Sequence, residues 1–354
     1  MNRCKAFMEA LHAKGETAAV LHRGENMRYL TGYTGEGCVF VTDDAWVIVT
    51  DSRYTEQAGR QAPECACEMT KYGRGENDVL KELTARYGVK RLCAESDYLT
   101  YKAYTAKQAA LEGVELIDLG GIPEELRTRK DAYEIECIKK ACAISCDAFN
   151  NILGRMKVGM TEKEIALMLE YEMYSLGGEG LAFDTIAAAG VNGSLPHAIP
   201  SDYRVQSGDL LTLDFGTKID GYCADMTRTV GFGKVSPQLR EMYEDVRAAQ
   251  QMGLDAAKPG ACCGDVDKQV RDYLNGKYPG CFGHGLGHGV GLFIHENPRF
   301  SIGQTTVLTP GIAITVEPGV YIPGVGGCRI EDTIIITEDG HYDCVYAPKQ
   351  LIEL

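Results

Sequence analysis

Short apolar runs alternate with amphipathic stretches along the first third of the chain. The runs, each of the length of a buried strand, lie at residues 18–21, 38–41 and 46–49. Stretches with helix-like patterning lie at residues 4–13, 53–60, 76–86 and 101–112. This alternation predicts a small α/β domain that closes near residues 116–119.

A longer amphipathic stretch follows a charged connector at residues 124–130. It predicts a helix over residues 131–155, because apolar side chains recur there at helical spacing, at Ile135, Ile138, Cys142, Phe149 and Ile152.

Three further helices are marked by their first residues. Thr161 and Glu164 form a capping-box pattern, which predicts that a helix begins there. Ser236 and Pro237 place a cap and a first-turn proline before another helix. Asp265 is the expected cap of the next one.

Strand-like segments lie between and after these helices, at residues 210–216, 221–231, 312–322 and 328–337. Helices and antiparallel hairpins within one domain favour an α+β fold. We therefore expect a smaller N-terminal α/β domain over residues 1–125 and an α+β domain over residues 126–354.

Composition and charge narrow the range of functions. The chain has 354 residues, a formal net charge of -14 and a pI of about 5.0, which does not suit contact with a nucleic-acid backbone. The N-terminus lacks the apolar core of a signal peptide, and no stretch reaches the roughly 18 apolar residues of a membrane helix. We expect a cytoplasmic protein that binds neither nucleic acid nor membrane and whose 14 cysteines are reduced thiols.

Two aspartates flank a strong hairpin signal in residues 210–232. Asp220-Gly221 favours a two-residue turn, which pairs residues whose numbers sum to 441. Residue 216 then faces Asp225, and Asp214 points to the same face as residue 216. The two aspartates become diagonal neighbours with Cβ atoms about 7–8 Å apart or less, close enough to share a pair of cations.

A second hairpin is predicted in residues 314–336, with its turn in the glycine-rich run 323–327. A turn centred on Gly324 places Glu317 opposite Glu331, although Pro318 interrupts the strand. Acids inside apolar runs are costly unless they reach water or are neutralised. For any one of these four acids, a position on a water-exposed sheet face is as plausible as a position in a site. For all four together, exposure to water is the weaker explanation.

Three histidines lie in a glycine-rich segment at residues 280–298: His284, His288 and His295. Glycines alternate with other residues from 283 to 291 and permit tight turns and close approach to a ligand. A fourth histidine, His197, follows a separate Asn-Gly-Ser-Leu-Pro run. A lone histidine is more often a hydrogen-bonding group of the fold, whereas a glycine-flanked trio favours a site.

Other catalytic signatures are missing from the sequence. There is no GxSxG, P-loop, HExxH or GxGxxG motif. A cysteine–histidine nucleophile stays open because the chain has many cysteines, but it would not account for the four acids.

These motifs, taken in order, resemble the pita-bread metallopeptidase family. That family includes methionine aminopeptidase, Xaa-Pro aminopeptidase, Xaa-Pro dipeptidase and the metal-free creatinases. The resemblance covers nearly the whole chain, and NMRYLTGYTG (26–35) and TDSRYTEQA (50–58) are similar to the creatinase-type N-terminal domain. It implies a pita-bread catalytic domain over residues 126–354. The N-terminal domain and the RIED stretch at residues 329–332 favour the proline-directed branch over methionine aminopeptidase.

The resemblance also assigns site residues. It implies five metal ligands, which the creatinases lack: Asp214, Asp225, His288, Glu317 and Glu331. It implies catalytic roles for Glu317 again and for His197, His284, His295 and Arg329.

One imidazole and four carboxylates suit two divalent ions per chain. We expect manganese first, with cobalt, iron or zinc as alternatives. Such ions, about 3.5–4 Å apart, would activate a shared water for attack on a peptide carbonyl. Glu317 would move the proton, His197 and His295 would stabilise the intermediate, and Arg329 would orient Glu317 or another acid nearby.

The resemblance implies an Xaa-Pro aminopeptidase, acting on peptides with proline at the second position. An Xaa-Pro bond lacks an amide N–H and is conformationally restricted, so a dedicated pocket is needed to accept it. The nearest alternative is an Xaa-Pro dipeptidase (prolidase), and a more distant one is a non-catalytic pita-bread binding protein. A homodimer is expected from the resemblance alone.

Overall fold

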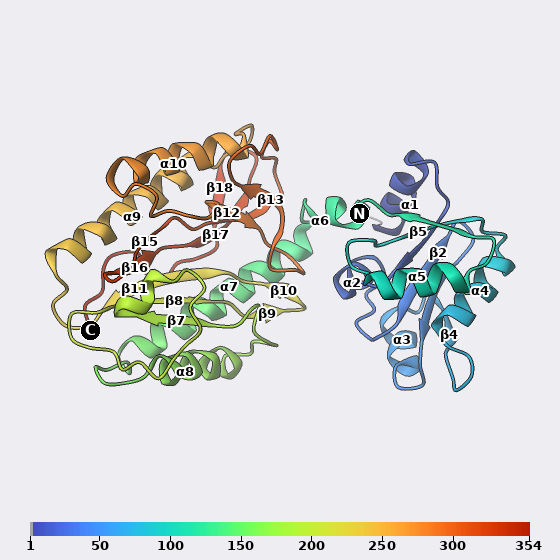
Figure 1. The fold of residues 1–354 in the computed structure, drawn as a ribbon, viewed down its shortest axis with the longest axis horizontal. Helices are drawn as coiled ribbons and strands as arrows, with labels where there is room; N and C mark the ends of the chain where they lie inside the picture. Colours follow the sequence, from blue (N-terminus) through green and yellow to red (C-terminus); the bar gives the residue numbers. More distant parts are fainter. Residues whose placement is uncertain (1–2) are drawn as a thin grey trace. The chain divides into compact units, whose positions relative to one another are not determined.

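The computed structural model describes residues 3–354. The chain forms two compact units, one up to Arg127 and one from Thr128 onward (Figure 1). Among the described residues, no helix combines the length and the apolar character needed to cross a membrane.

The first unit is built on a mixed six-stranded sheet with the strand order β4-β3-β2-β1-β5-β6. The three strands β1, β2 and β3 pair antiparallel, and the outer pairings are parallel. The strands are β1 (Ala18–Leu21), β2 (Cys38–Thr42), β3 (Trp46–Thr50), β4 (Ala66–Met69), β5 (Arg91–Ala94) and β6 (Glu115–Asp118). The helices are α1 (Arg3–Ala13), α2 (Gly24–Thr31), α3 (Thr55–Gln61), α4 (Glu76–Arg86), α5 (Tyr101–Ala110) and α6 (Ile122–Arg127).

Alternate side chains of the central strands point to one face and are covered by α4. Val20, Phe40 and Val49 belong to the same buried cluster as Leu80 and Leu83 of that helix. The elements expected from the apolar pattern are all present. The expectation of a charged connector at 124–130 is wrong in part, because residues up to Arg127 form the short helix α6.

The second unit combines two antiparallel sheets and two small hairpins with four long helices. The sheets have the orders β11-β8-β7 and β13-β12-β14-β17-β18, and the hairpins are β9-β10 and β15-β16. The helices are α7 (Ala132–Leu153), α8 (Glu162–Ser175), α9 (Pro237–Ala256) and α10 (Cys263–Lys277), with a short 3-10 helix at Gly190–Ser194. The first strands are β7 (Ile186–Ala189), β8 (Leu210–Phe215), β9 (Lys218–Ile219), β10 (Tyr222–Cys223) and β11 (Met226–Gly231). The later strands are β12 (Gly287–Gly289), β13 (Glu296–Phe300), β14 (Ala313–Val316), β15 (Gly319–Ile322), β16 (Gly326–Arg329), β17 (Asp332–Ile336) and β18 (His341–Asp343).

Each sheet of this unit has its own pair of helices. Buried residues of α7 and α8 form one apolar cluster with β7, β8 and β11, and those of α9 and α10 form another with β14 and β17. Figure 1 shows the two helix pairs on opposite sides of the strands. The α+β architecture expected from the sequence is confirmed.

Two of the three expected helix caps are confirmed. Thr161 accepts a hydrogen bond from the backbone N–H of Glu164, and Ser236 accepts one from that of Leu239. The third expectation is wrong, because Cys262 is the N-cap of α10 and Asp265 lies in the first turn. A carboxylate in the first turn still interacts favourably with the helix dipole.

The strands expected at 221–231, 312–322 and 328–337 are each interrupted. The breaks fall at Asp225, at Glu317 and at Glu331. At two of these breaks the backbone bonds to another part of the unit: Glu317 N–H donates to Leu286 and Glu331 N–H donates to Thr227. The second of these bonds ties the second hairpin to the first sheet.

Candidate active site

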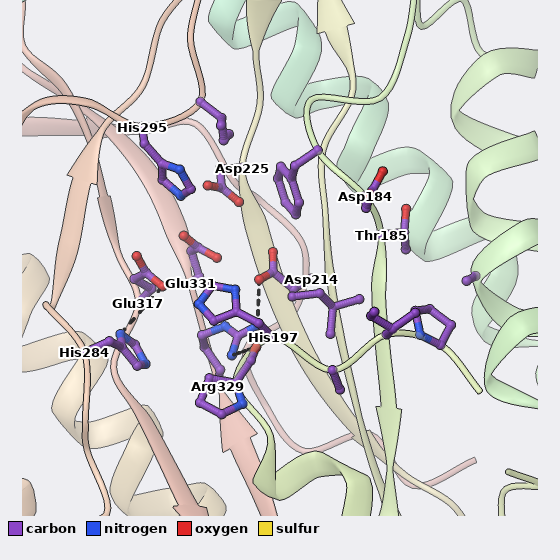
Figure 2. A pocket seen from close by; sticks show the side chains of 18 of the residues that line it. Asp184, Thr185, His197, Asp214, Asp225, His284, His295, Glu317, Arg329 and Glu331 are labelled. Atoms are coloured by element: carbon purple, nitrogen blue, oxygen red, sulfur yellow. Dashed lines mark hydrogen bonds and ion pairs between the residues drawn. The ribbon is translucent and has the colours of Figure 1, made fainter. Parts of the chain in front are cut away.

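One cavity of the second unit, with a volume of about 850 Å³, gathers the sequence-predicted residues. Figure 2 shows carboxylates and imidazoles from several strands facing one another within it. All nine predicted residues line it: Asp214, Asp225, His197, His284, His288, His295, Glu317, Arg329 and Glu331.

The first hairpin has the expected register. Asp220 and Gly221 both have positive φ, 46° and 73°, as a two-residue turn of this type requires. Phe215 pairs with Met226, so paired numbers sum to 441 as predicted, and Asp214 lies opposite Thr227. The turn therefore sets which carboxylates share a face.

The second hairpin also has the expected register. Gly319 pairs with Arg329, and Val316 pairs with Asp332, which is the pairing implied by a turn at Gly324. Glu317 and Glu331 occupy the gap between these two paired segments. Leaving the ladder at this point turns both carboxylates into the cavity.

His288 joins the carboxylates from a different strand, β12. Its Nε2 lies 3.4 Å from Asp225 Oδ2 and 3.4 Å from Glu317 Oε1. Its Nδ1 contacts the carbonyl of Gly289 at 3.1 Å, which orients the ring.

The glycines on either side of His288 have a packing role. A Cβ on Gly287 would meet the Thr315 carbonyl oxygen at 2.0 Å, and one on Gly289 would meet that of Asn297 at 2.3 Å. Neither residue has positive φ. The expectation of tight turns is therefore wrong for these two glycines, which let β12 fit between β13 and β14. The expectation of close approach to a ligand stays a prediction, and Gly287 lines the cavity.

The carboxylate cluster carries a large electrostatic cost. Burial, followed by the neighbouring carboxylates, raises the pKa of Asp225 and that of Glu331 well above their ordinary values. Burial also raises the pKa of Glu317 to about 8, against the opposing effect of Arg329. Burial lowers the pKa of His288 to about 3, so that its imidazole is neutral at physiological pH.

This donor set fits divalent cations. Among residues 3–354, Asp225, His288 and Glu331 offer ligand atoms that lie within 4.8 Å of one another. Asp214 Oδ1 and Glu331 Oε1 are buried without a hydrogen-bond partner, although buried carboxylate oxygens are normally satisfied. A cation would supply both the missing partners and the missing positive charge.

Arg329 connects the cluster to the other polar groups of the cavity. It donates to Asp214 Oδ2 at 2.6 Å, to Tyr321 Oη at 2.7 Å and to Thr227 Oγ1 at 3.1 Å. Of the two alternatives expected for Arg329, Glu317 or another acid, the geometry selects Asp214.

Tyr321 and Thr227 were not identified from the sequence. Tyr321 Oη also lies 2.9 Å from His284 Nε2, and Thr227 Oγ1 donates to Glu331 Oε2 at 2.6 Å. The two hairpin registers could have identified both residues. Thr227 pairs with Asp214, and Tyr321 lies two residues after Gly319, which pairs with Arg329.

The remaining histidines differ in their surroundings. Burial, followed by Arg329, lowers the pKa of His284 to about 4. Burial likewise lowers the pKa of His295, whose ring stands edge-on to that of His288 with 4.5 Å between centroids. His197 lies in the loop after the 3-10 helix Gly190–Ser194, and its chain enters the cavity from the side opposite these two (Figure 2).

The cysteine–histidine alternative loses support. None of the cavity-lining residues is a cysteine in the part of the chain that the structure describes. Cys328, next to Arg329, is fully buried, and burial raises the pKa of its thiol to about 12, so it does not supply a thiolate at neutral pH.

Comparison with known proteins identifies the family. Residues 136–338 match metallopeptidase family M24, and residues 3–129 match the creatinase/prolidase N-terminal domain. The chain belongs to metallopeptidase family M24. An uncharacterized peptidase of Bacillus subtilis is 42% identical to this M24 chain over 93% of each sequence.

Two solved structures resemble the M24 chain over almost its full length. An Xaa-Pro dipeptidase from Bacillus anthracis has a TM-score of 0.95 and 38% identity, with 99% of each chain covered. An X-Pro aminopeptidase from Thermotoga maritima has a TM-score of 0.88 and 34% identity, covering 96% of this chain and 98% of its own. Family M24 implies divalent metals, in keeping with the buried Asp, His and Glu cluster.

Proposed function

We propose that the chain is a two-metal exopeptidase that hydrolyses the bond between a first residue and a following proline, as an Xaa-Pro aminopeptidase. The observation that carries this proposal is that four carboxylates and a neutral imidazole line one cavity. Two of the buried carboxylate oxygens there have no hydrogen-bond partner. Two similar solved structures, an Xaa-Pro dipeptidase and an X-Pro aminopeptidase, support peptides with proline in second position as the substrate class.

In this proposal Asp214, Asp225, His288, Glu317 and Glu331 would hold the ions. Bound divalent ions supply Lewis-acid polarisation and a lowered pKa for a coordinated water. The expected identity is manganese, with cobalt, iron or zinc as alternatives.

The chain's own residues would then move the proton and position the substrate. Glu317 would accept the proton of the attacking water and pass it to the departing amine. His197 and His295 would donate hydrogen bonds to the developing oxyanion from opposite sides of the cavity. Arg329 would hold Asp214 in place, and Tyr321 would couple Arg329 to His284.

The size of the cavity favours the aminopeptidase assignment. A volume of about 850 Å³ is near the upper end of ordinary small-ligand pockets and leaves room for residues beyond the proline.

Arg299 favours the second candidate function, an Xaa-Pro dipeptidase. Its side chain projects from β13 and lines the same cavity as the carboxylate cluster. A guanidinium binds a carboxylate in a bidentate manner, and a dipeptide presents its C-terminal carboxylate directly after the proline.

The test compares hydrolysis of Ala-Pro, Ala-Pro-amide and Ala-Pro-Ala by the manganese-loaded protein, with an EDTA control. We expect cleavage of Ala-Pro-Ala that EDTA abolishes. Cleavage of Ala-Pro alone, weakened roughly tenfold or more by Arg299→Leu, would make the chain a dipeptidase instead. Failure to cleave any of the three would contradict both assignments.

A further inference from the structure

One wall of the cavity consists of α8 and the segment 183–185, and the mechanism above uses none of its side chains. Four residues of α8 line the cavity at helical spacing: Lys163, Ala166, Leu167 and Glu170. Asp184 and Thr185 lie next to each other on the far side of the cavity from His284 and Glu317 (Figure 2).

This wall carries unneutralised negative charge. Glu170 is half-buried and Asp184 is exposed to solvent; both line the cavity, and neither forms a hydrogen bond or ion pair with another residue in the described range 3–354. The nearby cation is engaged elsewhere, because Lys163 Nζ pairs with Asp202 at 3.1 Å. A cationic group entering from the cavity would therefore meet two carboxylates without a competing partner.

Thr185 supplies an independent indication of a ligand. Its side chain lines the cavity, the residue is only 4% exposed, and its Oγ1 has no hydrogen-bond partner among the described residues. A buried hydroxyl left without a partner costs free energy comparable to a lost hydrogen bond. A polar group of a bound molecule would satisfy it.

The two arginines of the cavity come from other elements. Arg329 lies on β16 and Arg299 on β13, and both line the cavity. A positively charged substrate group is therefore repelled by these guanidinium groups and attracted to the wall that bears Glu170 and Asp184.

We propose that Glu170, Asp184 and Thr185 form the subsite for the side chain of the residue before proline, and that this subsite prefers a lysine or arginine side chain. The inference rests on the proposed function, because it takes the substrate to be a peptide with proline in second position. The two carboxylates bind the side-chain ammonium or guanidinium, and the Thr185 hydroxyl accepts a hydrogen bond from it.

The experiment measures kcat/KM of the manganese-loaded protein for Lys-Pro-Ala, Leu-Pro-Ala and the dipeptides Lys-Pro and Leu-Pro. The variants are Glu170→Gln, Asp184→Asn and Thr185→Val. The matched control is Glu172→Gln, because Glu172 lies on the same helix but bonds to Asn151 and Arg155.

We expect the wild-type protein to prefer lysine over leucine as first residue. Each carboxylate variant should lower the lysine-to-leucine ratio of kcat/KM about threefold to tenfold, while Glu172→Gln leaves it unchanged. An unchanged ratio in Glu170→Gln and Asp184→Asn overturns the subsite. An equal loss for both first residues also overturns it, because the carboxylates would then act on the α-amino group. The proposed function fails separately, if the wild-type protein cleaves none of the leucine substrates.

Discussion

Arg329 links several polar groups of the cavity, because it donates hydrogen bonds to Asp214, Tyr321 and Thr227. Burial would lower its pKa, but Tyr321 and the surrounding carboxylates raise that pKa well above the ordinary value, so the guanidinium stays charged. It is thus the one permanent cation beside Asp214, with a distance of 2.6 Å between Nη2 and Oδ2, within the part of the chain described. It offsets part, but not all, of the charge of four acids.

Replacing Asp214 by Asn should remove bound metal and activity together. The change removes one negative charge from the proposed ion site and leaves Arg329 with a neutral partner. We expect metal affinity and kcat/KM to fall by roughly a hundredfold or more. Metal content after dialysis and hydrolysis of Ala-Pro-Ala measure the two quantities, and full activity in this variant would sink the metal-dependent scheme.

Replacing Tyr321 by Phe should separate metal binding from turnover. The hydroxyl links Arg329 to His284 but offers no ligand to the carboxylate cluster. We expect kcat to fall about tenfold with the metal content unchanged. Tyr203→Phe, which removes a hydroxyl bonded to Asp209 outside the cavity, is the control. Loss of metal in Tyr321→Phe would contradict this division of roles.

At the scale of elements, the narrow space around β12 decides where His288 stands. The strand lies between β13 and β14, and its glycines are in contact with the backbone of both neighbours. The position of the His288 imidazole therefore depends on the two glycines that flank it, Gly287 and Gly289.

Replacing Gly287 by Ala should destabilise the second unit and impair the site. The added methyl group would lie 2.0 Å from the Thr315 carbonyl oxygen, which cannot move without shifting β14. We expect a loss of about 1–3 kcal/mol in unfolding free energy. Gly283→Ala is the matched control, because its added Cβ meets nothing within 4 Å. Thermal unfolding followed by circular dichroism measures both, and equal melting temperatures would contradict the packing argument.

Local patterns were sufficient to predict the elements and both hairpin registers. The Asp220-Gly221 turn and the glycine run around Gly324 each specify a pairing through neighbouring residues alone. Pro318 marked the interruption beside Glu317 in advance. The interruption at Glu331 could not be predicted, because the backbone there bonds to Thr227, distant in sequence. The roles of Tyr321 and of the β12 glycines depend on the same long-range packing.

At the scale of the whole molecule, the first unit holds a partly buried polar network of its own. His22 Nε2 and Lys107 Nζ lie 3.0 Å and 2.6 Å from Glu76 Oε1. Burial would raise the pKa of Glu76, but the contacts with His22 and Lys107 outweigh it and lower that pKa to about 2. The network therefore favours the ionised carboxylate in the folded state.

The stability of this unit should depend on pH through Glu76. Because the folded-state pKa lies below the ordinary value of 4.5, the contribution is complete above about pH 4.5 and is lost as the pH falls toward 2. We expect Glu76→Gln to lower the urea midpoint at pH 7 and to lower it less at pH 3. Trp46, the single tryptophan, lies in β3 of this unit and provides the fluorescence signal. Glu112→Gln, on the surface, is the control, and a difference that does not change with pH would contradict the assignment.

The site is complete only when the two parts of the second unit that carry its residues have folded together. Asp214 and Asp225 come from one sheet, whereas His288, Glu317 and Glu331 come from the other sheet and the hairpin beside it. The backbone bond between Glu331 and Thr227 is one of the contacts that join the two sets, together with the pair of Arg329 and Asp214. During synthesis, the segment with the aspartates is made before the one with Glu331 and offers only two of the five proposed ligands. We therefore expect metal loading to follow the joining of the two sheets, so that ions taken up would report that both sheets have joined.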